Sequence, residues 1–180
     1  MKFKIIKDKN PKMRKRSEVV SLPLSEEDKV TLDFMLNYLI KSQDDDYAKK
    51  HHIKAGVGLA AIQIGLLKRM FVVYFQTESK VVQYQLVNPI IIESSVKLCA
   101  LKGGEGCLSV DEDHPGLSHR HYMIKMKAFD ALTNQEVNIK ATGFEAVLLQ
   151  HEYDHLDGIF YYDRIDKNHP HEVKPNEEII

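Results

Sequence analysis

Apolar residues recur every three or four positions in two stretches of the chain, and this period predicts two amphipathic helices. The first helix follows a helix-start signal at residues 25–28 and is expected to end within the polar cluster at residues 42–46. Its predicted apolar face consists of Leu32, Met35, Leu36, Leu39 and Ile40. The second helix is expected to begin at a capping box formed by Thr142 and Glu145 and to end before Gly158.

Four other runs are rich in Val, Ile, Tyr and Phe, a composition that is typical of strands. They extend over Met70 to Phe75, Tyr84 to Ile92, Tyr122 to Phe129 and Glu136 to Ala141. The last two runs flank residues 132–134 and predict a hairpin. Because the strands cluster ahead of the second helix instead of alternating with helices, we expect an α+β fold, with antiparallel strands packed around that helix at its centre.

The second predicted helix contains the sequence His151-Glu152-Tyr153-Asp154-His155. Histidines four positions apart on a helix project from the same face, so both can bind one metal while the Glu between them acts on a bound water. The two histidines also continue the apolar stripe of Phe144, Val147 and Leu148, which is expected to face the core. The stretch predicts a metal-dependent hydrolase, and the alternative is a pair of buried, hydrogen-bonded core histidines.

Length and charge narrow the class of protein. At 180 residues the chain can bury a core of its own, and we expect a single domain over residues 1–180. A net charge of −1 gives no reason to expect specific nucleic-acid binding or membrane association. The absence of a signal-peptide pattern and of a membrane-spanning apolar run favours the cytoplasm.

The two ends of the chain are polar. Residues 1–16 are strongly basic and include Lys2, so they are a candidate contact for ribosomal RNA, although such runs are more often a solvated surface. Residues 167–178 are polar and contain two prolines, which predicts a loop or a loose tail.

Residues 56–63 are small and apolar apart from one amide, a composition that predicts a buried turn where a ligand can approach the backbone. The stretch lacks the third glycine of a dinucleotide-binding fingerprint. Gln63 is its functional candidate, because an uncharged amide can donate to a developing oxyanion without competing for a metal.

Two histidines leave a catalytic metal site one protein ligand short. Cys107, in the glycine-rich stretch of residues 103–109, could be that third ligand. Cys99, the other cysteine, lies in an apolar run and is expected to be buried in the core. In a reducing cytosol a disulfide between the two is not expected.

Three of these stretches together resemble the peptide deformylases. They are G-φ-G-φ-A-A-x-Q at Gly56 to Gln63, E-G-C-φ-S at Glu105 to Ser109, and Q-H-E-φ-D-H at Gln150 to His155. The resemblance follows the order of the family and extends more loosely from Asn10 to Ile165. Within the family, the middle section and residues 107–111 are most similar to the longer, type 2 bacterial subclass.

The resemblance implies a role for each matching position. The implied metal ligands are Cys107, His151 and His155. Glu152 is the implied general base, and the Gln63 side chain and the Leu108 amide are the implied oxyanion donors. Glu105 and Arg120 correspond to an ion pair that braces the active site.

The resemblance also implies a substrate, a cofactor and a partner. The substrate is the N-terminal formyl-Met of newly made polypeptides, and formate is a product. One divalent metal per chain is implied, with Fe²⁺ expected and Zn²⁺, Ni²⁺ or Co²⁺ as replacements. Some members dock on the ribosome through a C-terminal helix, which residues 167–180 do not resemble. The residues expected to contact the substrate are Val57, Gly58, Gly104, Glu105, Phe144, Val147 and Leu148.

Two other functions are open on the sequence alone. A zincin-type endopeptidase is one, because Gly158 fits its extended motif, but Tyr161 stands where that motif has its third histidine. Glu172 or Glu177 would then have to be the third ligand. The other is a non-catalytic protein in which Cys99 completes a closed metal site with four ligands.

Overall fold

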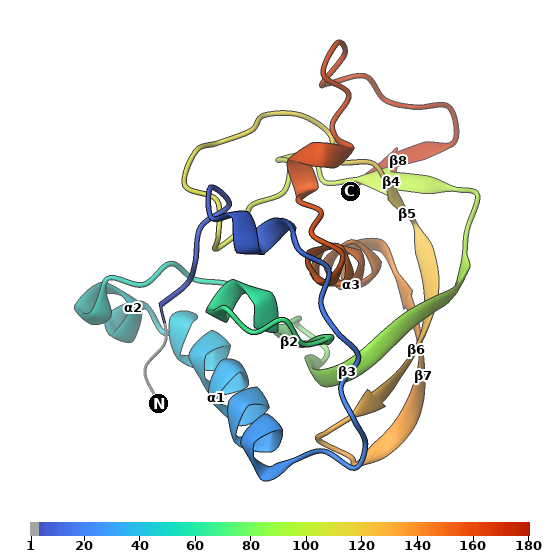
Figure 1. The fold of residues 1–180 in the computed structure, drawn as a ribbon. Helices are drawn as coiled ribbons and strands as arrows, with labels where there is room; N and C mark the ends of the chain where they lie inside the picture. Colours follow the sequence, from blue (N-terminus) through green and yellow to red (C-terminus); the bar gives the residue numbers. More distant parts are fainter. Residues whose placement is uncertain (1–3) are drawn as a thin grey trace.

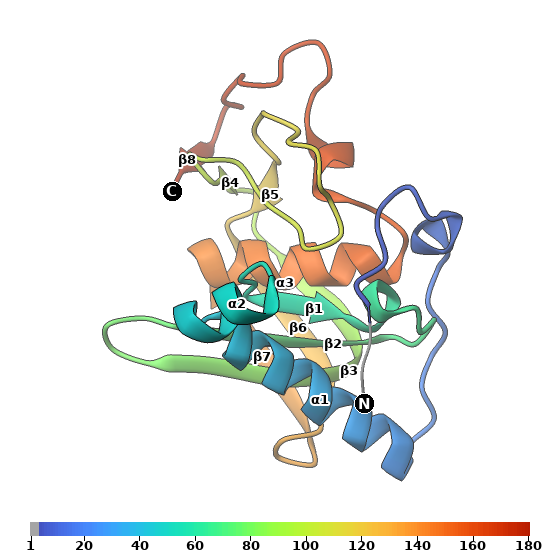
Figure 2. The same ribbon diagram turned by 90° about the vertical axis from the view of Figure 1, so that its left-hand side faces the viewer.

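The computed structural model describes residues 4–180 and arranges them as two β-sheets with one helix between them (Figures 1 and 2). Lys2, part of the predicted basic run, lies outside the described residues. The helix is α3, Gly143–Leu156, and it contacts strands of both sheets. The prediction of a mixed fold with an antiparallel sheet is therefore confirmed.

The larger sheet has five strands in the order β1-β2-β3-β6-β7, and all its neighbouring strands are antiparallel. Its strands are β1 Gly58–Ala60, β2 Met70–Gln76, β3 Val81–Ser94, β6 Met123–Asp130 and β7 Gln135–Thr142. The smaller sheet has three strands in the order β5-β4-β8, and β8 is parallel to β4. Its strands are β4 Leu98–Ala100, β5 Arg120–His121 and β8 Glu177–Ile179.

Two further α-helices are α1, Glu26–Ser42, and α2, Asp45–His51. The described residues also contain three short 3-10 helices, at Pro11–Arg14, Ala61–Ile64 and Tyr161–Arg164. Within residues 4–180, no helix combines the length and the hydrophobicity that a membrane crossing requires.

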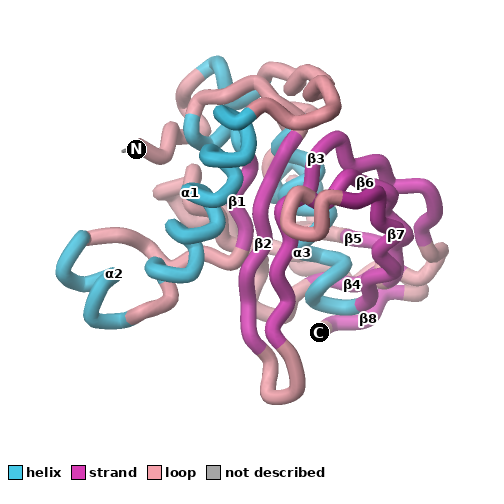
Figure 3. Tube along the Cα trace, turned by 90° about the horizontal axis from the view of Figure 1, so that it is seen from below, coloured by secondary structure: helices cyan, strands magenta, loops and turns pink. Residues whose placement is uncertain are grey.

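The side chains of β2 explain why α1 and α3 lie on different faces of the larger sheet. Met70 and Val72 pack into the core beneath α1, whereas Phe71 and Val73 pack into the core beneath α3. Successive side chains of a strand point to opposite faces, so an unbroken apolar run is buried on both. Figure 3 shows α1 alongside β1 and β2.

Helix α1 confirms the first predicted helix. Ser25 caps it, and the Ser25 hydroxyl accepts a hydrogen bond from the Asp28 amide (3.1 Å). The prediction for Ile40 is wrong, because its side chain is 37% exposed. One residue beyond the buried Leu39, the helix has turned by about 100° and carries Ile40 out of the packed stripe.

The four predicted strands correspond to β2, β3, β6 and β7, and β3 extends beyond its prediction at both ends. Strands β6 and β7 form the predicted hairpin, with Asp130 paired to Gln135 at its closed end. Long strands with a buried face are therefore visible in the sequence pattern.

Helix α3 begins where expected, but the predicted capping box is wrong. Thr142 makes no side-chain capping bond, because it is still an extended residue of β7. Glu145 instead accepts a hydrogen bond from the Tyr84 hydroxyl (2.8 Å). Phe144, which was expected to face the core, is 42% exposed. The chain therefore enters the helix directly from a strand, and its first turn lies at the surface.

The shortest elements escape the sequence pattern. Strand β1 lies inside the predicted turn at residues 56–63, and α2 begins within the predicted polar cluster. Strand β8 lies in the segment predicted to be a loose tail, so that prediction is wrong for its last residues. Strands of two or three residues are too short to show an alternation of apolar and polar positions.

Candidate metal centre

Three side chains from two parts of the chain meet in the interior. Cys107, from the loop that follows β4, lies against His151 and His155 of α3. All three residues are buried, and their ligand atoms lie within 4.8 Å of one another. The Cys107 Sγ is 3.3 Å from the His155 Nε2. The spacing of four residues on α3 turns both imidazoles to one face, where the thiol completes a compact donor set.

This donor set fits a divalent metal. Thiolate and imidazole ligands suit zinc and ferrous iron, and three protein ligands leave one position open for chemistry. Glu152 lies on the same turn of α3, is 2% exposed, and its Oε2 has no hydrogen-bond partner among the described residues. A buried carboxylate oxygen without a partner is costly, so it is expected where a protein binds a further group.

The surroundings of Glu152 favour a proton acceptor. Burial raises the pKa of Glu152 to about 7. Gly58 on β1 leaves room for its carboxylate, because a Cβ at position 58 would overlap the carboxylate group. The absence of a side chain at Gly58 is therefore a requirement of the site and not only of the strand.

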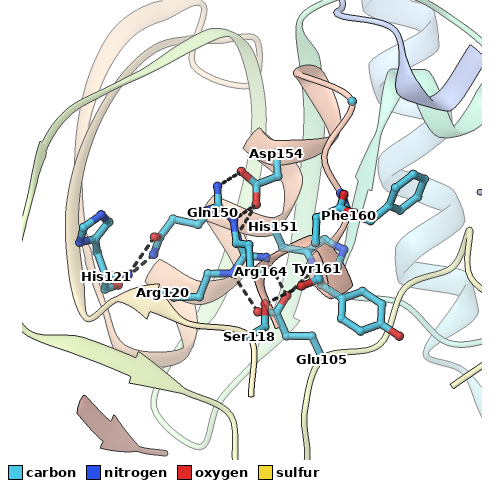
Figure 4. A network of polar contacts seen from close by, with 12 residues as sticks. Glu105, Ser118, Arg120, His121, Gln150, His151, Asp154, Phe160, Tyr161 and Arg164 are labelled. Atoms are coloured by element: carbon cyan, nitrogen blue, oxygen red, sulfur yellow. Dashed lines mark hydrogen bonds and ion pairs between the residues drawn. The ribbon is translucent and has the colours of Figure 1, made fainter. Parts of the chain in front are cut away.

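Arg120 of β5 binds two carboxylates beside the candidate metal ligands (Figure 4). Its guanidinium makes two hydrogen bonds to Glu105, from Nε (2.8 Å) and from Nη2 (2.9 Å). It also forms an ion pair with Asp154 of α3, to which Arg164 donates two further bonds of 2.5 Å. Both partners of the Arg120–Glu105 pair are almost fully buried.

Glu105 in turn orients one of the candidate ligands. The Glu105 Oε2 accepts a hydrogen bond from the His151 Nδ1 (2.7 Å). Although burial opposes ionisation, the charge of Arg120 and the hydrogen bond from His151 lower the pKa of Glu105 to about 2. An ionised carboxylate only accepts, so Nδ1 carries the proton and Nε2 is left for a metal.

Gln63 is held at both ends of its amide. Its Oε1 accepts from the Ala60 amide (2.7 Å), and its Nε2 donates to the Ser109 hydroxyl (3.1 Å). The same Nε2 lies 3.6 Å from the Cys107 Sγ. The donor side of this amide therefore faces the cluster. Leu108, the next residue after the cysteine, lines the adjoining cavity.

A cavity of about 270 Å³ opens onto the cluster. The residues around it include most of those predicted to contact a substrate, namely Val57, Gly58, Glu105, Phe144, Val147 and Leu148. Gly104 does not line it: its φ of +73° belongs to a turn in which its amide donates to the Leu101 carbonyl (2.9 Å). Gln43 and Lys54 also line the cavity, and the sequence pattern gave no sign of either.

The ligands of the two alternative functions do not join the cluster. Cys99 is fully buried in β4 but outside the group of ligand atoms, and burial raises the pKa of its thiol to about 11. Tyr161 stacks parallel to the His151 ring at 6.2 Å instead of replacing a ligand. Glu177 binds His119, and Glu172 is exposed, so neither completes an endopeptidase site.

A second group of potential ligands, Asp166, His169 and Glu172, lies in the C-terminal segment. Lys174 already pairs with both acids, at 3.5 Å and 3.2 Å. This group is largely exposed and balanced by its own cation, so it is not comparable with the buried cluster.

Asp154 is the residue of the centre that the sequence reasoning missed. It lies inside the HExxH stretch, is 3% exposed and binds two arginines. Its signal was available, since an acid in the buried turn of a helix needs a cationic partner. The identity of that partner was not available, because Arg120 lies 34 residues away on β5 and Arg164 lies beyond the end of the helix.

The site combines an HExxH helix, a cysteine thiol and a buried carboxylate beside an apolar cavity. This combination is typical of a metallohydrolase centre. A sequence model of the polypeptide deformylase family matches residues 2–171 of this chain. The peptide deformylase of Staphylococcus epidermidis is 47% identical over 178 residues, which cover 98% of this chain and 96% of the relative. That of Halalkalibacterium halodurans is 48% identical over 164 residues, with 90% and 89% covered.

A solved structure agrees with these relatives. The peptide deformylase from Thermus thermophilus is similar with a TM-score of 0.74 at 29% identity, over 93% of this chain and 87% of that one. The chain belongs to the peptide deformylase family. It is therefore a hydrolase that acts in N-terminal protein processing and removes the formyl group from newly made polypeptides. The two alternatives, an endopeptidase and a non-catalytic protein, are not favoured. The family depends on a metal, and this chain has a Cys/His/His site for one.

Proposed function

We propose that Cys107, His151 and His155 bind one divalent metal, Fe²⁺ in the native enzyme, and that this centre deformylates peptides that begin with formyl-Met. The observation that carries the proposal is the meeting of these three ligands with the unpartnered, buried carboxylate of Glu152. Zn²⁺, Ni²⁺ and Co²⁺ are expected to occupy the same donor set.

Glu152 is the proposed general base. When bound, a divalent metal supplies Lewis acidity and lowers the pKa of a nearby water. Glu152 accepts the proton of that water and later delivers it to the leaving amine. A pKa of about 7 suits both directions of transfer near neutral pH. The freedom of its Oε2 from other partners supports this role.

Gln63 and Leu108 are the proposed oxyanion donors. Water adds to the formyl carbon, and negative charge then develops on the formyl oxygen. The Gln63 Nε2, which already faces the cluster, and the Leu108 backbone amide would stabilise that charge. The fixed amide of Gln63 supports this assignment, because a donor held in advance loses no freedom during the reaction.

The cavity is the proposed pocket for the methionine side chain. Val57, Val147 and Leu148 give it apolar walls, and the exposed edge of Phe144 forms its rim. A flexible thioether fits such a pocket better than a charged side chain, whose burial would be costly. Gly104 stays a prediction as a substrate contact, and the longer bacterial subclass stays a prediction as well.

We further propose that residues 1–180 act as one catalytic unit with α3 at its centre, and that the enzyme acts in the cytosol on nascent peptides. For contact with ribosomal RNA, the basic N-terminus offers only the part of its charge that is not already paired. Lys7 binds Asp111 and Lys9 binds Glu112, both at 2.6 Å.

The proposal is tested by anaerobic purification, metal analysis and an assay of formate release from a formyl-Met peptide. We expect one equivalent of metal per chain and formate release that ends when a chelator removes the metal. Release of internal peptide fragments in the same assay would support an endopeptidase instead. Stoichiometric zinc with full activity that is stable in air would leave the centre in place and overturn the choice of iron.

A further inference from the structure

The C-terminal segment holds the chain that leads to the proposed thiolate ligand. Strand β8 forms the outer edge of the smaller sheet beside β4 (Figure 2). The Leu98 N–H donates to the Asn176 carbonyl (3.0 Å), and the Lys102 N–H donates to the Ile180 carbonyl (2.8 Å). The Ile180 N–H donates back to the Ala100 carbonyl (3.0 Å). Strand β8 therefore pairs with β4 at three positions, whereas β5 pairs with it at two.

A buried polar contact anchors this strand. The side chain of Glu177 is fully buried, whereas that of the neighbouring Glu178 is 45% exposed. The Glu177 Oε1 is 2.7 Å from the His119 Nδ1, and its Oε2 accepts from the Lys174 amide (2.8 Å). Each of the two carboxylate oxygens of Glu177 therefore has a partner.

The contact between Glu177 and His119 adjoins the charged residues that surround the candidate metal ligands. His119 is the residue before β5, whose first residue is Arg120. Arg120 binds Glu105, and Glu105 binds His151. On the other side, β4 leads within a few residues to Glu105 and then to Cys107. The smaller sheet thus connects β8 both to Cys107, in the loop after β4, and to His151, on α3.

We infer that β8 is a positioning strand for the metal centre, with Glu177 as its anchor. Glu177 acts through His119 on the position of Arg120. Arg120 in turn holds Glu105, whose carboxylate orients His151. The inference rests on the proposed metal centre and extends it, because it makes a buried acid near the end of the chain a determinant of metal geometry. Groups outside the ligand shell commonly affect metal affinity or activity by about 10- to 100-fold.

The test compares Glu177→Gln with Glu178→Gln in the cobalt-loaded enzyme. In Glu177→Gln the amide oxygen can accept from only one of the two partners, and the amide N–H₂ keeps the contact with His119 only if the imidazole changes tautomer. Glu178→Gln makes the same change one residue later, at an exposed ion pair with Lys97. The readouts are the thiolate-to-cobalt absorption band, the rate of cobalt release to a chelator, and kcat and KM for a formyl-Met peptide.

We expect Glu177→Gln to shift the absorption band, to release cobalt about tenfold faster and to lower kcat several-fold, with KM within about twofold of wild type. KM should change little because the apolar walls of the proposed methionine pocket, Val57, Val147 and Leu148, come from α3 and from the residue before β1. Glu178→Gln should match wild type within about twofold in each readout. His119→Asn, whose amide can donate in place of Nδ1, should recover most of the wild-type values, whereas His119→Leu should behave like Glu177→Gln.

The outcomes separate the two proposals. A wild-type cobalt enzyme without a thiolate band would overturn the metal centre and this inference with it. A wild-type band and activity that persist unchanged in Glu177→Gln and His119→Leu would overturn the positioning role alone. If these variants only lower the unfolding temperature, while the band, the cobalt release rate and kcat of the folded enzyme stay at wild-type values, β8 is merely structural and the inference is wrong.

Discussion

The two sheets on either side of α3 are stabilised by different interactions. The larger sheet buries apolar side chains on both faces, such as Phe71 towards α3 and Met70 towards α1. The smaller sheet has strands of only two or three residues, and buried charged side chains, among them Arg120 and Glu177, hold these strands in position. Apolar burial is strong but non-directional, whereas buried ion pairs add little stability and fix geometry. The larger sheet therefore supplies the stable core, and the smaller sheet aligns the metal centre.

The largest expected effect lies on α3, which belongs to both regions. Glu152→Gln keeps the shape of the side chain but removes the proton acceptor, so we expect formate release to fall by about 10²- to 10⁴-fold. Metal content should stay near wild type, because Glu152 is not one of the three clustered ligand residues. The measurements are kcat for a formyl-Met peptide and metal per chain.

Glu145→Gln is the matched control for this variant. It makes the same change on the same helix, at a carboxylate that binds Tyr84 outside the cluster. We expect less than a twofold loss of kcat. Retention of more than about a tenth of wild-type activity in Glu152→Gln would remove Glu152 from the role of base.

Breaking the charge network of the smaller sheet should come next. Arg120→Leu leaves Glu105 as a buried carboxylate without its arginine and leaves Asp154 with Arg164 alone, which is expected to cost about 3–5 kcal/mol of unfolding free energy. Metal affinity should also fall by about 10- to 100-fold, because Glu105 no longer holds His151 in place. Denaturant unfolding and competition with a metal chelator measure the two effects.

Arg164→Leu is the control for the network. Arg164 shares Asp154 with Arg120, but its side chain is 40% exposed. We expect a loss of about 1 kcal/mol or less and no change in metal affinity. Equal effects of the two arginine variants would show that the network contributes only stability, and the proposed difference between the two sheets would fail.

The difference between the two sheets also explains how much of each could be predicted from the sequence. Strands β2, β3, β6 and β7 are long and contain β-branched or aromatic residues, so their composition predicts them, and the HExxH stretch predicts the ligands that share a helix face. The smaller sheet leaves no such trace, since its strands are short and its contacts join residues as distant as His119 and Glu177. Arg120 was found only through the family resemblance, and Asp154 was not found. Periodicity reports burial, but it does not report which charges meet.

A core substitution beneath the larger sheet should have the opposite signature to Arg120→Leu. Leu39 of α1 is fully buried, and Leu39→Ala should lower the unfolding free energy by about 2–5 kcal/mol. The affinity for metal and the kcat of the folded enzyme should stay within about twofold of wild type, because Leu39 belongs to the apolar core beneath α1 and Cys107 belongs to the other core. Ile40→Ala, at the exposed neighbouring position, should cost less than about 1 kcal/mol. A large loss of metal affinity in Leu39→Ala would mean that the two regions are not separable.

The smallest expected effect concerns the cysteine of the smaller sheet that is not a ligand. Cys99 lies in β4 and Cys107 a few residues later, so the pair tests how sharply the metal centre is bounded. Cys99→Ser places a hydroxyl at a fully buried position and should cost about 1–3 kcal/mol of stability while leaving metal content unchanged. Cys107→Ser should weaken or change the bound metal, because a hydroxyl is a poor substitute for a thiolate.

In the native enzyme, Cys99 should also resist alkylation at neutral pH, since burial raises its pKa to about 11 and limits access to the thiol. Metal analysis of both variants, with mass spectrometry of alkylated wild type before and after unfolding, measures this. Equal metal loss in the two variants would revive the closed site with four ligands, in which Cys99 itself binds the metal.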